Sequence, residues 1–255
     1  MFAVAFVAFG LLQFLYGDFV PGRPPAWPEQ VYGGWIWAYA SGAWFVVAGV
    51  AIFVDRHTRL AAFSIAALVF AWAVTRNVPI ALADPSFGNA WTRLGKAVAL
   101  SGGALAVAAS ARHGDRRGLA GLGVVGRVAL GVFLIDSGVQ HFLFAEFVAT
   151  LVPTWIPGAR LWTYLAGVAL IAGGAGLIVP QTTRLAGFSV ALMVFTWTCI
   201  LHLPRALSAA PANQRNEWTA VFEALAFAGL ALVLAQLSVA SDRSSAKPVA
   251  TASPL

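Results

Sequence analysis

The feature that most constrains the fold is a segment that occurs twice in the chain. Residues 13–20, QFLYGDFV, align with residues 141–148, HFLFAEFV. The turns that follow, Pro25-Ala26-Trp27 and Pro153-Thr154-Trp155, align at the same offset. A repeat fixes the number of structural units before any helix is counted. The sequence therefore predicts a tandem duplication, in which the first copy is degenerate.

Composition then decides the class of protein. Hydrophobic residues make up 60% of the 255 residues and charged residues 10%, whereas a soluble domain has about 25% charged residues. The chain is therefore predicted to be a membrane protein in contact with the lipid bilayer. The net charge of +6 does not indicate a nucleic-acid partner, because the basic residues fall mainly in short loops, where they set the orientation of the helices.

The apolar runs predict an all-α polytopic membrane protein with eight transmembrane helices, arranged as two parallel four-helix repeats. The expected spans are residues 1–16, 35–54, 60–82, 91–110, 124–147, 162–179, 185–203 and 218–237. The expected domains are a first repeat at 1–110, a cytoplasmic linker at 111–123, a second repeat at 124–237 and a disordered tail at 238–255. Pro79 is expected to end or kink the third span, because proline removes a backbone donor.

The basic and aromatic residues indicate the orientation. Nine of the sixteen Lys and Arg residues fall on the face that holds both predicted termini, whereas most tryptophans and all four tyrosines fall on the opposite face. Basic residues favour the cytoplasmic side, and amphipathic rings favour the headgroup layer. Both termini are therefore expected in the cytoplasm.

Several polar residues stand inside the apolar runs, where their burial is costly and needs a reason. Asp136 and Gln140 are one helical turn apart, as are Ser137 and His141, so these four are expected to form one polar stripe. The polar side chains of the second repeat are expected to meet in a pocket below the turn at Trp155. The candidate ligand-binding residues are Asp136, Gln140, His141, Trp155, Trp197, His202 and Glu223.

Two simpler explanations stand beside this one. A buried His or Gln in a membrane bundle also hydrogen-bonds between helices without any further role, and Trp155 also fits an interfacial anchor. The first repeat has Gln13, Asn77 and Lys96 at the matching positions. The first repeat has therefore lost most of the titratable groups, and a ligand site is expected in the second repeat.

Lys96 and Glu223 occupy equivalent positions in the fourth and eighth spans. If these two spans approach a pseudo-two-fold axis, the two charges can pair and offset part of their desolvation cost. The sequence thus predicts an ion pair between the two repeats.

Metal and thiol chemistry receive little support. The single cysteine, Cys199, excludes an intrachain disulfide and a Cys-x-x-Cys redox pair. His141 and His202 could ligate a haem b, but the companion histidine pair of multihaem anchors is absent. Two histidines and Glu223 would give a metal three ligands and an open position, which is no better supported. No metal site is predicted.

Four segments of the second repeat resemble the DoxX-like family of four-helix membrane proteins. They are residues 138–142, GVQHF; 153–157, PTWIP; 162–164, WTY; and 217–225, EWTAVFEAL. The resemblance implies a bacterial inner-membrane protein, because the family is named for a small subunit associated with a thiosulfate:quinone oxidoreductase. It provides no catalytic motif, so catalytic residues are not assigned and an enzymatic activity stays open.

Three functions are compatible with these observations. The first is a quinone-facing membrane subunit or partner of a soluble or membrane oxidoreductase, in which His141 or Glu223 would hydrogen-bond a quinone carbonyl or exchange its proton. The second is a non-catalytic binder or carrier of a small hydrophobic molecule or lipid. The third is a structural scaffold or chaperone for a membrane complex.

Overall fold

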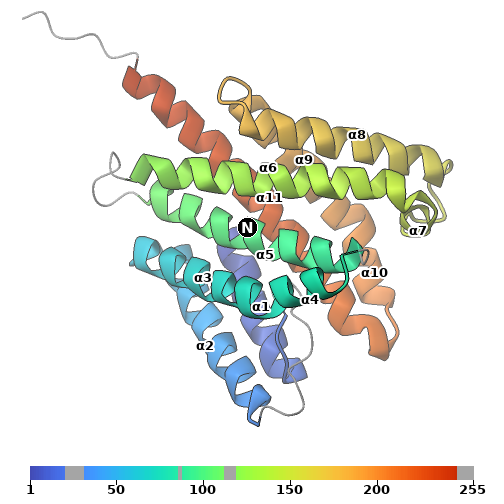
Figure 1. The fold of residues 1–255 in the computed structure, drawn as a ribbon, viewed down its shortest axis with the longest axis horizontal. Helices are drawn as coiled ribbons and strands as arrows, with labels where there is room; N and C mark the ends of the chain where they lie inside the picture. Colours follow the sequence, from blue (N-terminus) through green and yellow to red (C-terminus); the bar gives the residue numbers. More distant parts are fainter. Residues whose placement is uncertain (21–31, 86–87, 112–118, 246–255) are drawn as a thin grey trace, which may run out of the picture.

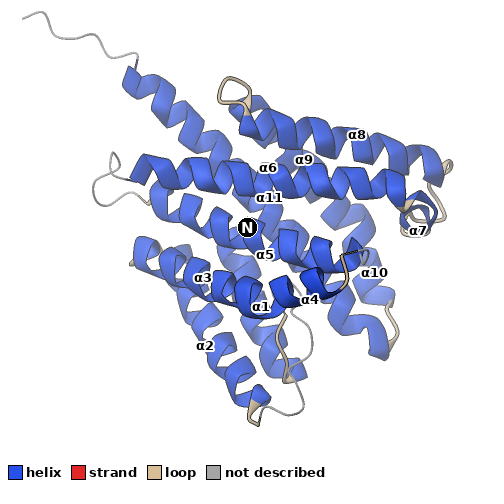
Figure 2. Cartoon of the chain, in the orientation of Figure 1, coloured by secondary structure: helices blue, strands red, loops and turns tan. Residues whose placement is uncertain are grey.

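The computed structural model describes residues 1–20, 32–85, 88–111 and 119–245. All regular secondary structure in these ranges is helical (Figure 2), which confirms the predicted all-α class. In lipid, a helix satisfies its backbone hydrogen bonds within itself, so an apolar chain of this composition is restricted to helices or closed barrels.

The helices fall into two halves, before and after residues 112–118. The first half contains α1 (Phe2–Tyr16), α2 (Gly34–Phe53), α3 (Thr58–Trp72), the π-helical turn η1 (Ala73–Asn77), α4 (Val78–Ala83) and α5 (Gly88–Ser110). The second half contains α6 (Ala120–Leu143), α7 (Ala145–Ala149), α8 (Ala159–Ile178), α9 (Thr183–Trp197), the π-helical turn η3 (Thr198–His202), α10 (Leu203–Ser208) and α11 (Pro211–Ser245).

Four elements of the second half match four elements of the first half in length and order. Helices α8, α9 and α10 and the turn η3 each begin and end 125 residues after α2, α3, α4 and η1, respectively. Each π-helical turn precedes a proline, Pro79 or Pro204, at the first turn of the next helix. The predicted kink at Pro79 is thus a π-helical turn through which the helix continues, because a widened turn accommodates the missing proline N–H.

Six helices among the described residues are long and apolar enough to cross a membrane. They cover Gly34–Phe53, Thr58–Ala83, Gly121–Leu143, Ala159–Ile178, Thr183–Ser208 and Pro211–Val239. The chain is therefore an integral membrane protein whose outer surface contacts the bilayer. Helix α1 is apolar but has only 15 residues, or about 22 Å, and α5 carries Arg93 and Lys96.

Several element bounds differ from the predicted ones, and α11 begins at Pro211 rather than at residue 218. The fifth predicted span ends at Leu143 rather than Phe147, because Phe144 leaves helical geometry and the short helix α7 follows. Helix α11 continues to Ser245, so residues 238–245 of the predicted disordered tail are helical. This segment contains neither glycine nor proline, the residues that usually end a helix. Residues 246–255 lie outside the described residues.

Helices α5 and α11 lie in the middle of the molecule, with α1 to α3 on one side and α6, α8 and α9 on the other (Figure 1). Around this centre, α1 packs on α2, α2 on α3 and α3 on α5, while α6 packs on α8, α8 on α9 and α9 on α11. The halves join where α5 packs on α6, α1 on α11 and α5 on α11.

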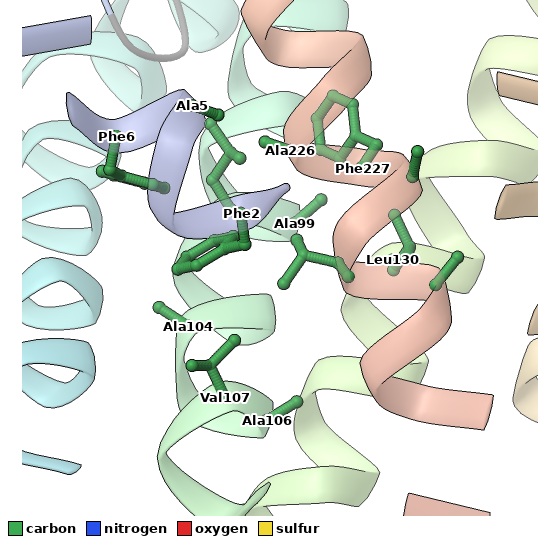
Figure 3. Close-up of a cluster of buried hydrophobic side chains, with 14 of the residues drawn as sticks. Phe2, Ala5, Phe6, Ala99, Ala104, Ala106, Val107, Leu130, Ala226 and Phe227 are labelled. Atoms are coloured by element: carbon green, nitrogen blue, oxygen red, sulfur yellow. The ribbon is translucent and has the colours of Figure 1, made fainter. Parts of the chain in front are cut away.

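Small residues allow the central helices to approach closely. A Cβ atom added to Gly103 of α5 would lie 2.2 Å from Leu230 Cδ1 of α11, and one added to Gly102 would lie 2.6 Å from Ala129 Cβ of α6. The buried core between α1, α5, α6 and α11 is mainly phenylalanine, leucine and alanine (Figure 3), including Phe2, Leu130 and Phe227. Small residues at such contacts are typical of membrane helix packing.

Candidate functional site

The centre of the candidate site is an ion pair between the two middle helices. Lys96 Nζ of α5 lies 2.6 Å from Glu223 Oε2 of α11, and the two side chains are 19% and 3% exposed. This contact confirms the pairing predicted from the equivalent positions of the two residues. A buried charge is costly unless it is paired, so the contact offsets part of the cost of burying the two side chains.

His202 lies at the end of the π-helical turn η3. The charged side chains that act on its ring are those of Lys96, Arg205, Glu217 and Glu223. The turn η3 packs directly on α11, which carries both glutamates. The structure therefore brings His202 and Glu223, two of the predicted site residues, to one place.

A second ion pair joins α10 to α11. Arg205 of α10 donates two hydrogen bonds to Glu217 of α11, from Nη2 to Oε1 at 2.6 Å and from Nε to Oε2 at 3.2 Å. Such a two-point contact fixes orientation as well as charge. Arg215, two residues before Glu217, pairs with Asp18 at 2.7 Å and thereby joins the start of α11 to the segment after α1.

Asp136 and Gln140 form a hydrogen-bonded network with α5. Gln140 Nε2 donates to Asp136 Oδ2 at 2.8 Å, and Thr92 Oγ1 of α5 donates to Gln140 Oε1 at 2.5 Å. Thr92 and Lys96 are four residues apart on α5 and thus share a face. Sequence reasoning missed Thr92, although this spacing from Lys96 was a usable signal.

His141 lies on a different side of α6. Its Nδ1 donates to the carbonyl oxygen of Ser137 at 2.7 Å, and a Cβ atom added to Gly167 of α8 would lie 3.1 Å from His141 Cβ. Asp136 and Gln140 instead face α5. The four residues expected to form one stripe thus divide between two neighbouring helices, because adjacent positions on a helix point about 100° apart.

The two tryptophans of the predicted site have different environments. Trp155, in the segment between α7 and α8, is 69% exposed. Trp197 is partly buried against the core at the end of α9. The exposure of Trp155 fits the interfacial anchor that the sequence also allowed, and its described contacts do not place it over His202 and Glu223.

The first half has buried polar residues at the matching positions. Gln13 is fully buried and accepts a hydrogen bond from Ser41 Oγ of α2 at 3.3 Å, and Asn77 at the end of η1 is also buried. Among the residues that the structure describes, His, Cys, Asp and Glu side chains do not gather in groups of three suited to a metal ion. The site is therefore a set of ion pairs and neutral hydrogen-bonding groups.

Residues 130–241 match a family described as a domain of unknown function, DUF8561. The matched segment contains Asp136, Gln140, His141, His202 and Glu223, and it leaves out Lys96. No curated protein matches the chain, and no solved structure does. The second half of the chain is thus similar to a family whose description names no activity.

Proposed function

We propose that the chain is a duplicated eight-span protein of the bacterial inner membrane, with both termini in the cytoplasm. The shared offset of 125 residues between the elements of the two halves supports the duplication. Helices α1 and α5 supply the two spans beyond the six long apolar helices. The basic and aromatic distribution supports the orientation.

This protein binds a quinone-type molecule at the Lys96–Glu223 ion pair, as a membrane subunit or partner of a redox enzyme. The observation that carries the proposal is the ion pair itself, with Glu223 almost fully buried between the two middle helices. Ionisable groups at such depth commonly mark a ligand or proton pathway. His202 adds an imidazole ring that can hydrogen-bond a carbonyl, and the resemblance to DoxX-like proteins supports a redox setting.

The test compares two pairs of methionine substitutions. Lys96→Met with Glu223→Met removes the central pair without leaving a lone charge, and such apolar replacements are often tolerated. Glu146→Met with Arg160→Met removes an exposed pair between α7 and α8 and serves as the matched control. We expect binding of a short-chain quinone, followed by quenching of tryptophan fluorescence, to weaken about tenfold or more in the first variant only.

Unchanged quinone binding in a folded Lys96→Met/Glu223→Met protein would refute this proposal. The second candidate function, a structural scaffold, is favoured by the fact that the ion pair joins the two halves of the chain. A lower thermal stability in the same variant, with quinone binding absent from the wild type as well, would support the scaffold. A lipid or other hydrophobic molecule that is bound to the purified wild type but not to the Lys96→Met/Glu223→Met variant would support a carrier.

A further inference from the structure

A cavity of about 490 Å³ lies at the opposite end of the bundle from the ion pair. Ser110, one of its lining residues, follows Lys96 by 14 positions on α5, or about 21 Å along the helix. Its apolar walls come from α1, α2, α5 and α11, and include Phe2, Ile52, Val107, Leu232 and Val233. The volume falls within the range of about 300–1,000 Å³ that small-molecule pockets occupy.

The polar side of this cavity is the turn between α2 and α3. Asp55 and Thr58 line it, and Thr58 Oγ1 donates to Asp55 Oδ1 at 2.9 Å. Asp55 is the one acidic side chain among the described lining residues. The cavity thus has apolar walls and a carboxylate at one edge, which suits a molecule with a hydrocarbon chain and a cationic group.

The second half has different contacts at the positions 125 residues after Asp55 and Thr58. Thr183 follows Thr58 by 125 residues, and its Oγ1 accepts a hydrogen bond from Arg127 Nη1 of α6 at 3.4 Å. The residue 125 positions after Asp55 is Pro180. In the second half, Arg127 of α6 therefore lies beside Thr183. In the first half, the Asp55 carboxylate and the cavity lie beside Thr58.

Bilayer lipid is the molecule with access to this cavity. Phe53 and Val54, directly before Asp55, are 71% and 53% exposed, so the apolar surface that faces lipid continues to the edge of the cavity. The α2–α3 turn ends two candidate spans and thus lies at headgroup level. A lipid acyl chain can enter from the side while its headgroup stays at the turn.

We propose that this cavity is a binding site for a phospholipid with a primary amine headgroup. One acyl chain lies between the residues of α1, α5 and α11, and the ammonium group donates a hydrogen bond to the Asp55 carboxylate. This site is separate from the proposed quinone site, so the two proposals can fail independently.

The experiment uses the purified full chain and native mass spectrometry. The protein is exchanged into equal amounts of phosphatidylethanolamine and phosphatidylcholine with identical acyl chains, and the retained lipid is identified. The trimethylated choline headgroup cannot donate the hydrogen bond. We expect one retained lipid per chain, with the amine headgroup favoured about tenfold, as one charge-assisted hydrogen bond implies.

Two variants separate the headgroup contact from the cavity. Asp55→Asn removes the charge at a residue with φ of 53°, a conformation that Asn also adopts, and should abolish the preference for the amine headgroup. Val233→Trp fills the cavity and should abolish retention of either lipid. Val124→Trp, the same substitution at an exposed position of α6, serves as the control and should retain the lipid.

Equal retention of the two headgroups by the wild type would overturn the amine-headed site. Unchanged retention in Val233→Trp would show that the lipid lies elsewhere on the protein surface and would also overturn the proposal. Circular dichroism of each variant confirms that it is folded, and the two variants act on different atoms, so the failure of one to fold leaves the other as a test.

Discussion

At the residue scale, the Lys96–Glu223 pair is the polar contact at the centre of the bundle. Lys96 of α5 and Glu223 of α11 carry opposite charges and lie 2.6 Å apart. Like charges at these two positions would repel each other, and a lone buried charge would be costly. Opposite charges on the two middle helices therefore stabilise the contact between the two halves of the chain.

Charge reversal tests this pair directly. Lys96→Glu alone and Glu223→Lys alone should each lower the stability by about 3–5 kcal/mol, because each leaves uncompensated like charges in a buried place. The double reversal restores opposite charges and should recover most of the loss. Thermal unfolding in detergent measures all four proteins. A double variant no more stable than either single variant would show that the two side chains do not stabilise each other.

At the scale of elements, the contact between α6 and α8 depends on glycines. A Cβ atom added to Gly174 would lie 2.5 Å from the carbonyl oxygen of Gly131, and one added to Gly138 would lie 2.7 Å from that of Gly167. The backbones of the two helices touch at these places, as is common between membrane helices. His141 lies beside this contact, so the spacing of the two helices also sets its position.

Gly174→Ala is therefore expected to be destabilising. The added methyl group would push α8 away from α6, and overpacking of this kind costs about 1–3 kcal/mol. Gly121→Ala in α6 is the matched control, because a Cβ atom there meets nothing within 4 Å. Thermal unfolding should show a loss in the first variant and no loss in the second. Equal effects of the two substitutions would show that the helices are not in backbone contact.

The π-helical turn η3 contains a cysteine that can be labelled to report whether the turn lies in lipid or in water. Cys199 lies in η3, is exposed and belongs to the candidate span Thr183–Ser208, so its side chain should face lipid. A spin label on Cys199 is expected to collide with oxygen more often than with a water-soluble nickel complex. A label on Ala212→Cys in a Cys199→Ser protein should show the reverse preference. Preferential collision of the Cys199 label with nickel would place η3 in water.

At the scale of the whole molecule, the helix contacts form a closed circuit that passes through α5 and α11. Each half contributes its last helix to the centre, where it packs against the first helix of the other half. The halves are thus joined along their length, and the ion pair, the glycine contacts at Gly102 and Gly103 and the shared phenylalanine core all belong to this junction.

Reporter fusions test the proposed eight-span arrangement. Fusions at Thr58 and Gln181 should report the cytoplasm, because these positions precede α3 and α9 on the face with the termini. Fusions at Ser86 and Ala212 should report the external side. Six spans or the opposite orientation would change the sign at one or more of these four sites, and either result would contradict the arrangement.

The sequence by itself determined the helices and much of their bounds. Transmembrane helices satisfy their backbone hydrogen bonds locally, so apolar runs and prolines suffice to locate them. The predicted span at residues 35–54 corresponds to α2 at Gly34–Phe53, and the interruption near Pro79 corresponds to η1. The pairing of Lys96 with Glu223 was also predicted from the sequence, on the condition that the fourth and eighth spans approach each other, and the structure shows this contact.

Only the tertiary structure decided which face each polar residue presents to which neighbour. Gln140 and His141 are adjacent in sequence, yet one contacts Thr92 of α5 and the other lies against α8. The cavity beside Asp55 likewise depends on α1, α5 and α11 together. These contacts join segments distant along the chain, and the order and tilt of packed helices depend on the fit of whole side-chain surfaces rather than on the local pattern of any one helix.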